Sequence, residues 1–156
     1  MPKISIIVAA YNVEEYLQQC LNSLSNQTFS DFEAIIVNDA STDATAEILR
    51  RSAEKDPRII PVTHPHNQGL HLTRKTGVEH ASGEYAFFLD GDDDLAPETC
   101  AQLAEEINQH PVDILHFGIS VIGENGILDD ECKAFEAFNN TQTKNCTGSD
   151  IVRNIY

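Results

Sequence analysis

Short runs of β-branched and other apolar residues alternate along this chain with longer stretches in which apolar residues recur at helical spacing. Apolar runs of this kind are typical of strands buried on both faces, as in a parallel sheet covered by helices. The pattern predicts strands over 4–9, 32–37, 58–63, 85–89 and 112–122, and helices over 13–27, 44–55, 69–81 and 98–109. This alternation indicates an α/β layered fold with a mainly parallel sheet, in which the first strand is central.

Local signals predict where some of these helices begin and end. Asn12, with Glu15 three residues later, predicts a capping box at the start of the first helix. Ser82-Gly83 predicts a left-handed glycine stop after the third helix. The hydrophobic pattern dissolves after residue 122, and only a short final helix over 150–156 is predicted there. We therefore expect a core over 1–122, and over 123–156 an irregular acidic segment and the start of a helix.

Composition narrows the possible partners of this domain. The formal charge of -15 argues against nucleic acid or an anionic membrane surface as a partner, unless a cation lies between them. The four cysteines are dispersed and form no C-x-x-C pair, which favours reduced thiols and a cytoplasmic location. No segment approaches the roughly 20 apolar residues that a transmembrane helix needs.

Polar side chains follow three of the predicted strands, where an open α/β sheet binds its ligands. The most acidic of these segments is Asp90-Gly91-Asp92-Asp93-Asp94, directly after the fourth strand. Mg²⁺ and Mn²⁺ prefer oxygen ligands and take one or two carboxylates beside substrate phosphates, so this segment suits a metal-bound diphosphate. Gly91 lets the backbone approach a ligand closely. Taken alone, the segment also fits a solvated turn that caps the next helix.

Other phosphate and metal motifs are excluded by specific positions. An EF-hand loop would need glycine at Leu95 and glutamate at Ala101. Neither a dinucleotide-binding glycine fingerprint nor a P-loop follows the first strand, where the sequence reads Ala9-Ala10-Tyr11-Asn12. A metal-assisted diphosphate site therefore remains as the chemistry to test.

Six motifs in order and at matching spacing resemble the family 2 glycosyltransferases with the GT-A fold, a three-layer Rossmann-like sandwich. They are IIVAAYNVEEYL from Ile6, NQT from Asn26, FEAIIVNDASTD from Phe32, NQG from Asn67 with RKTG from Arg74, ASGEY from Ala81 and FLDGDD from Phe88. The resemblance spans residues 4–95. It implies an inverting transfer from a nucleotide-sugar donor, most often a UDP-sugar, with Mn²⁺ or Mg²⁺ as the cofactor and a glycan or lipid-linked acceptor.

The same resemblance assigns site residues by position. Asp39 would accept a hydrogen bond from the nucleobase, Asp92 would be the principal metal ligand, and Asp90 would lie beside the ribose or the metal. The donor-binding set is Ala9, Tyr11, Asn12, Glu14, Asp39, Asn67, Arg74, Asp90 and Gly91. The family commonly has proline at Ala9, aspartate at Asn38 and glycine at Ala40, and this chain departs from it at all three.

The general base of the reaction is not found in this sequence. Inverting transfer needs an acidic residue that takes the acceptor proton, and the downstream carboxylates, densest at Asp129-Asp130-Glu131, lack the family's surrounding pattern. We therefore expect the 156-residue chain to be the donor-binding portion of a longer enzyme and to lack the general base. In the full-length protein, we expect this portion to act at the inner face of the membrane. The alternative from a different class is a non-catalytic module that binds a sugar nucleotide or a protein.

Overall fold

The computed structural model describes residues 1–115, 122–123 and 126–127. The chain divides into two compact units, Met1–Glu106 and Ile107–Tyr156. Within the described residues, no helix has the length and apolar character that crossing a membrane requires. The predicted boundary at residue 122 stays a prediction, and the predicted helix over 150–156 lies outside the described residues.

The first unit contains a parallel sheet whose described strands are β1 (Ile4–Ala10), β2 (Phe32–Asn38), β3 (Ile59–Thr63) and β4 (Tyr85–Asp90). Their order is β3-β2-β1-β4, so the prediction of a central first strand is confirmed. In this register Ala10 pairs with Asn38 and Ala9 pairs with Asp90. The polar segments that follow β1, β2 and β4 therefore begin side by side at one edge of the sheet.

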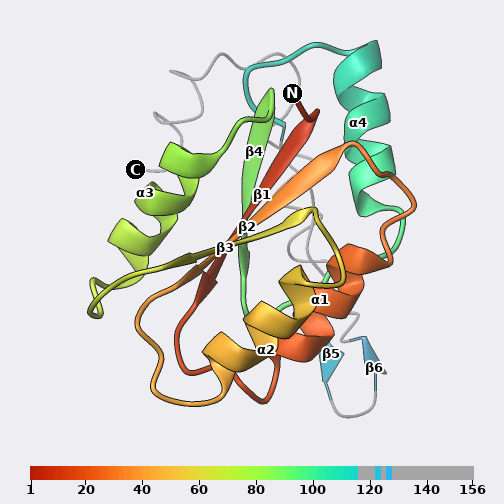
Figure 1. The fold of residues 1–156 in the computed structure, drawn as a ribbon. Helices are drawn as coiled ribbons and strands as arrows, with labels where there is room; N and C mark the ends of the chain where they lie inside the picture. The colour runs from red at the N-terminus through yellow and green to blue at the C-terminus, as the bar shows by residue number, and fades with distance from the viewer. Residues whose placement is uncertain (116–121, 124–125, 128–156) are drawn as a thin grey trace. The chain divides into compact units, whose positions relative to one another are not determined.

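The helices are α1 (Leu17–Ser25), α2 (Thr45–Ala53), α3 (Leu70–His80) and α4 (Thr99–Gln109). Each matches a predicted helix and is shorter, with the largest difference at the start of α1. Figure 1 shows α1 and α2 on one face of the sheet and α3 on the other. The first unit is therefore layered, as the alternation of strand and helix predicted.

The predicted strand over 112–122 is wrong in its first part, because residues 112–115 have no strand structure. Residues 116–121 lie outside the described residues. Ile122–Gly123 forms β5, which pairs antiparallel with β6 (Gly126–Ile127). This hairpin was not predicted, because two-residue strands are too short to show a hydrophobic period.

Two predicted helix signals serve other purposes in the structure. Tyr16, and not Asn12, occupies the N-cap of α1, and it makes no side-chain capping bond. Asn12 has a φ of 51°, and its side chain binds the loop after β2. Gly83 does not have a positive φ; a Cβ there would lie 2.7 Å from the Ser5 backbone nitrogen, so glycine is required by close packing. The predicted capping box and left-handed stop are therefore both wrong.

The packing of α3 on the sheet depends on Gly77. Ile6, Ile7 and Val8 of β1 are fully buried, and α3 packs against this strand at Ile7. A Cβ at Gly77 would lie 2.2 Å from Ile7 Cγ2, far inside van der Waals contact. The helix therefore lies as close to the sheet as the absence of a side chain allows.

A polar network holds the end of α3 against the opposite edge of the sheet. Ser5 Oγ and the Ser82 backbone N–H each donate to Glu33 Oε1, both over 2.6 Å, and the Gly83 N–H donates to Ser5 Oγ over 2.8 Å. Burial raises the pKa of Glu33, but hydrogen bonds from Ser5 and Ser82 outweigh burial and leave the pKa below its ordinary value. The ionised carboxylate therefore stabilises the folded state.

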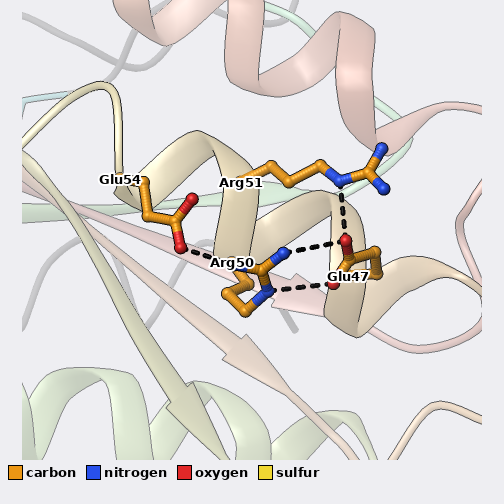
Figure 2. A network of polar contacts seen from close by, with 4 residues as sticks. All are labelled: Glu47, Arg50, Arg51 and Glu54. Carbon is orange, nitrogen blue, oxygen red and sulfur yellow. Dashed lines mark hydrogen bonds and ion pairs between the residues drawn. The ribbon is translucent and has the colours of Figure 1, made fainter.

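The outer surface of α2 carries a chain of ion pairs, which Figure 2 shows. Arg50 contacts Glu47 over 2.9 Å and also Glu54, and Arg51 contacts Glu47 over 2.6 Å. Hydrogen bonds from Arg50 and Arg51 lower the pKa of Glu47 to about 2. Exposed pairs at this spacing support the helix only slightly, so this network contributes to the local stability of α2.

We predict that Gly77→Ala destabilises the protein by about 1–3 kcal/mol, because the new methyl group must displace Ile7 or lift α3 from the sheet. Urea unfolding followed by circular dichroism measures the change. Val78→Ala is the matched control, since Val78 is 49% exposed on the same helix and should change stability by no more than about 0.5 kcal/mol. Equal stability of wild type and Gly77→Ala would contradict the packing described here.

We also predict that Glu33→Gln lowers stability at pH 7 by about 1 kcal/mol, because it removes a charge-assisted acceptor. The folded-state pKa of Glu33 lies below its unfolded value, so its contribution is present above the unfolded pKa and is lost as pH falls through the folded pKa. The gap between wild type and variant should therefore narrow below about pH 5. Urea unfolding at several pH values tests this, with Glu79→Gln, from the exposed Lys75–Glu79 pair, as the control. A gap independent of pH would refute the linkage.

Candidate functional site

A cavity of about 420 Å³ lies where β1, β2 and β4 end. Its walls come from the segments after these strands and from the first turn of α3. The lining residues are Ala9, Ala10, Tyr11, Val13, Asp39, Asn67, Gly69, Leu70, Thr73, Asp90, Gly91 and Asp92. This is the edge of an open α/β sheet at which ligands bind.

One wall of the cavity is fixed by hydrogen bonds between the loops after β1 and β2. Asn12 Oδ1 accepts from the Thr42 N–H over 2.9 Å, and Glu14 Oε2 accepts from the Ala44 N–H over 2.7 Å. In return, the Asn12 N–H donates to Ser41 Oγ over 3.0 Å. These reciprocal bonds hold the two loops together and position Tyr11, which is 48% exposed beside the cavity.

Asp39 is a buried carboxylate, only 2% exposed, at the end of β2. His64 Nδ1 lies 2.7 Å from its Oδ1, which also accepts from the Gln68 N–H over 2.9 Å, while Oδ2 accepts from the Gly69 N–H over 2.8 Å. Burial raises the pKa of Asp39, but the hydrogen bonds from His64, Gln68 and Gly69 outweigh it, so the pKa lies below its ordinary value. Asp39 is therefore ionised at neutral pH and fixed in orientation.

Backbone and side-chain contacts anchor the acidic segment after β4. The Gly91 N–H donates to the Ala9 carbonyl over 3.0 Å, and a Cβ at Gly91 would lie 3.0 Å from that same oxygen. At the other end, Asp94 Oδ2 accepts from Gln19 Nε2 over 2.7 Å. Burial raises the pKa of the neighbouring Cys20 thiol to about 12, so this cysteine is neutral and structural.

Arg74 of α3 forms an ion pair with Asp90, its guanidinium lying 2.8 Å from Asp90 Oδ1. Both side chains are partly exposed, at 36% and 43%. The guanidinium also lies 5.5 Å from the centre of the Phe88 ring. Arg74 therefore brings a positive charge to the acidic end of the cavity without lining it.

The electrostatics of this end suit a cation. Burial, followed by the charges of Asp92, Asp90 and Asp94, raises the pKa of Asp93 above its ordinary value, and a bound cation would relieve this repulsion. In the part of the chain that the structure describes, no three His, Cys, Asp or Glu side chains converge as a ready-made metal site. Asp90 and Asp92 both line the cavity and could supply the one or two carboxylates that Mg²⁺ or Mn²⁺ takes beside phosphate and water.

The structure brings together most, but not all, of the residues that the sequence indicated. Ala9, Tyr11, Asp39, Asn67, Asp90, Gly91 and Asp92 line one cavity. Asn12 and Glu14 do not line it, because their side chains bind the loop that leads to α2. Arg74 reaches the cavity only through Asp90.

Several residues at the site lie outside the set of site residues predicted from the sequence: His64, which contacts Asp39, and the lining residues Ala10, Val13, Gly69, Leu70 and Thr73. Leu70 and Thr73 line the cavity from α3, and their spacing of three residues places them on the face of that helix that also carries Gly77. His64 contacts Asp39 directly. His64 directly follows β3. Counting the polar residues after the third strand as candidate ligand-binding residues, as was done for the other three strands, would have included it.

Comparisons with known proteins agree with this geometry. The family described as "Glycosyl transferase family 2" matches residues 5–154. The uncharacterised glycosyltransferase EpsJ of Bacillus subtilis is 43% identical over 118 residues, which cover 76% of this chain and 34% of that protein. The chain thus spans about a third of the length of this relative.

Two solved structures extend the agreement to the fold. A crystal structure of TarS residues 1–349 from Staphylococcus aureus in complex with UDP superposes with a TM-score of 0.67 at 31% identity, covering 78% of this chain and 40% of that one. The mannosyltransferase PcManGT of Pyrobaculum calidifontis, in complex with GDP-mannose and Mn²⁺, superposes with a TM-score of 0.64 at 28% identity, covering 71% of this chain and 34% of that one. The parallel α/β sheet described above matches the GT-A sheet of these enzymes, and the chain belongs to glycosyltransferase family 2.

Proposed function

We propose that this chain binds the donor of an inverting glycosyltransferase, a nucleotide-diphospho-sugar with uridine as the nucleoside. The observation that carries the proposal is the single cavity that joins Tyr11, Asp39, Asp90 and Asp92 at the ends of three parallel strands. The exposed ring of Tyr11 offers a flat surface for a nucleobase. TarS, a relative in fold and sequence, is described in complex with UDP, which supports uridine as the nucleoside.

Each end of the cavity suits one part of such a donor. Asp39, ionised and buried, is a hydrogen-bond acceptor only, which matches the imide N–H of uracil. At the other end, the Arg74–Asp90 pair lies beside the acidic segment, where ribose and diphosphate would follow the base. The proposed donor therefore runs from Asp39 toward Asp92.

Asp92, with Asp90 beside it, would hold a Mn²⁺ or Mg²⁺ ion. Asp92 is the better candidate, because one oxygen of Asp90 already accepts from Arg74. When bound, the ion supplies positive charge that stabilises the diphosphate as it leaves. The described complex of PcManGT with Mn²⁺ supports this choice of metal.

The general base is proposed to come from outside this cavity. Asp39 is held by three hydrogen-bond donors and Asp90 is ion-paired, so neither carboxylate is poised to take a proton from an acceptor hydroxyl. We propose that the base and the residues that contact a glycan or lipid-linked acceptor lie outside the 1–122 core.

We predict that Asp92→Ala weakens UDP binding in the presence of Mn²⁺ by about ten-fold or more, because the diphosphate loses its metal bridge. Isothermal titration calorimetry with UDP, with Mn²⁺ and with EDTA, measures the metal-dependent part. Asp94→Asn is the matched control, since it removes a charge from the same segment and keeps an oxygen for Gln19. Equal metal-dependent affinity of wild type and Asp92→Ala would remove Asp92 from the metal site.

We also predict that the full-length protein turns over its donor. Incubation with a panel of UDP-sugars and Mn²⁺ should release UDP with time, by transfer or by slow hydrolysis, and the released UDP can be measured by chromatography. The Asp92→Ala protein serves as the comparison. Binding without turnover, across donors and acceptors, would contradict a transferase and favour a non-catalytic sugar-nucleotide-binding module.

A further inference from the structure

His64 connects the cavity to α3 through two hydrogen bonds. Its side chain is 6% exposed and stands at the end of β3, where the His64 N–H donates to the Asn38 carbonyl over 3.0 Å. Nδ1 lies 2.7 Å from Asp39 Oδ1, and Nε2 lies 2.9 Å from Thr76 Oγ1. The ring is therefore held at both nitrogens, between a cavity carboxylate and a helix.

The contacts of Asp39 fix which ring nitrogen carries the hydrogen. An ionised carboxylate accepts hydrogen bonds and cannot donate them, so Nδ1 must donate to Oδ1. In neutral imidazole the other nitrogen then accepts, and the Thr76 hydroxyl can supply that hydrogen. This tautomer is assigned from the hydrogen-bonding partners.

The two oxygens of Asp39 are not equally occupied. Each carboxylate oxygen has two acceptor positions. From the residues that the structure describes, Oδ1 receives two donors, the His64 ring and the Gln68 N–H, whereas Oδ2 receives the Gly69 N–H. One acceptor position of Oδ2 therefore remains for a ligand in the cavity that Asp39 lines.

We propose that His64 is a positioning residue for nucleobase recognition: by filling Oδ1 and fixing the carboxylate plane, it leaves Oδ2 of Asp39 as the oxygen that reads a base N–H. This inference rests on the proposed binding of a uridine nucleotide and adds a determinant of specificity outside the residues that line the cavity. Without the donor at Nδ1, Oδ1 keeps only the Gln68 N–H, so the carboxylate is held less firmly and Oδ2 is no longer the one oxygen with an open acceptor position.

The consequence is that the preference of the site for uracil over cytosine depends on His64. Uracil presents an N–H at position 3, where cytosine presents a lone pair. A fixed acceptor at Oδ2 favours uracil and repels cytosine, because a site built to accept a hydrogen bond discriminates strongly against a ligand that cannot donate one. Loss of the positioning contact should therefore lower the affinity for UDP and leave the affinity for CDP nearly unchanged.

Two amide substitutions at this position separate the two contacts of the ring. His64→Asn places an amide near the position of Nδ1 and can still donate to Asp39, whereas His64→Gln places its amide near Nε2 and reaches Thr76 instead. Calorimetry with UDP and with CDP, in the presence of Mn²⁺, gives the preference for each variant. We expect His64→Asn to keep the wild-type preference within about three-fold, and His64→Gln to lose about ten-fold of it.

Two further variants, one at His66 and one at Thr76, keep the test decisive. His66→Ala, on the exposed part of the same loop, should bind both nucleotides as the wild type does. Thr76→Val removes the hydroxyl partner of Nε2 and should lower the preference by about three-fold. It carries the test if the substitutions at His64 do not fold.

The outcomes distinguish this inference from the proposed function. A wild-type protein that binds neither UDP nor CDP would overturn the proposed function and this inference with it. If the wild-type protein prefers UDP and His64→Gln shows the same preference, only the role of His64 is overturned. The same holds for Thr76→Val where the His64 variants do not fold. Equal weakening of UDP and CDP binding in His64→Gln would likewise assign His64 a purely structural role.

Discussion

A buried charge must be satisfied by hydrogen bonds, and the site of this protein is arranged around one such charge. Asp39 is 2% exposed and ionised, and an unpaired carboxylate there would cost several kcal/mol. Its donors are the His64 ring and the Gln68 and Gly69 backbone N–H groups, all from the segment between β3 and α3. The carboxylate therefore fixes that segment, and with it the start of α3, against the end of β2.

The start of α3 is also shaped by Gly69. Gly69 has a φ of 83°, which side-chain-bearing residues adopt only under strain, and its N–H donates to Asp39 Oδ2. Leu70 and Thr73 then line the cavity, and Gly77 lies on Ile7 farther along the same helix. One buried charge and one close helix–sheet contact thus determine the position of the whole α3 wall.

The opposite wall is held by a different interaction. Asn12 and Glu14 accept hydrogen bonds from the backbone of the loop after β2, so the two loops behave as one surface. That loop contains Ala40 at a φ of 57°, in the left-handed region that glycine adopts most readily. The protein retains this left-handed turn despite the cost of a Cβ, and the buried Asn38 supports it by accepting from the Ser41 N–H over 3.0 Å.

The sequence by itself determined the order and type of the described elements in the first unit, the central place of β1, and the edge of the sheet at which the polar residues gather. Apolar runs flanked by helical periods carry this information locally, and the parallel arrangement brings the strand ends together. The identities of Asp39, Asp90 and Asp92 as cavity residues followed from the same rule together with the family resemblance.

Only the tertiary structure decided which polar side chains face the cavity and which hold its walls. Asn12 looks like a helix cap in the sequence, yet its oxygen binds a backbone N–H 30 residues away. The position of His64 directly after β3 places it at the same edge of the sheet, but nothing near it in the chain indicates its contacts with Asp39, 25 residues earlier, and Thr76, 12 residues later. Hydrophobic period and capping motifs report neighbours along the chain, whereas the pairing of a buried charge depends on elements that meet only when the sheet is formed.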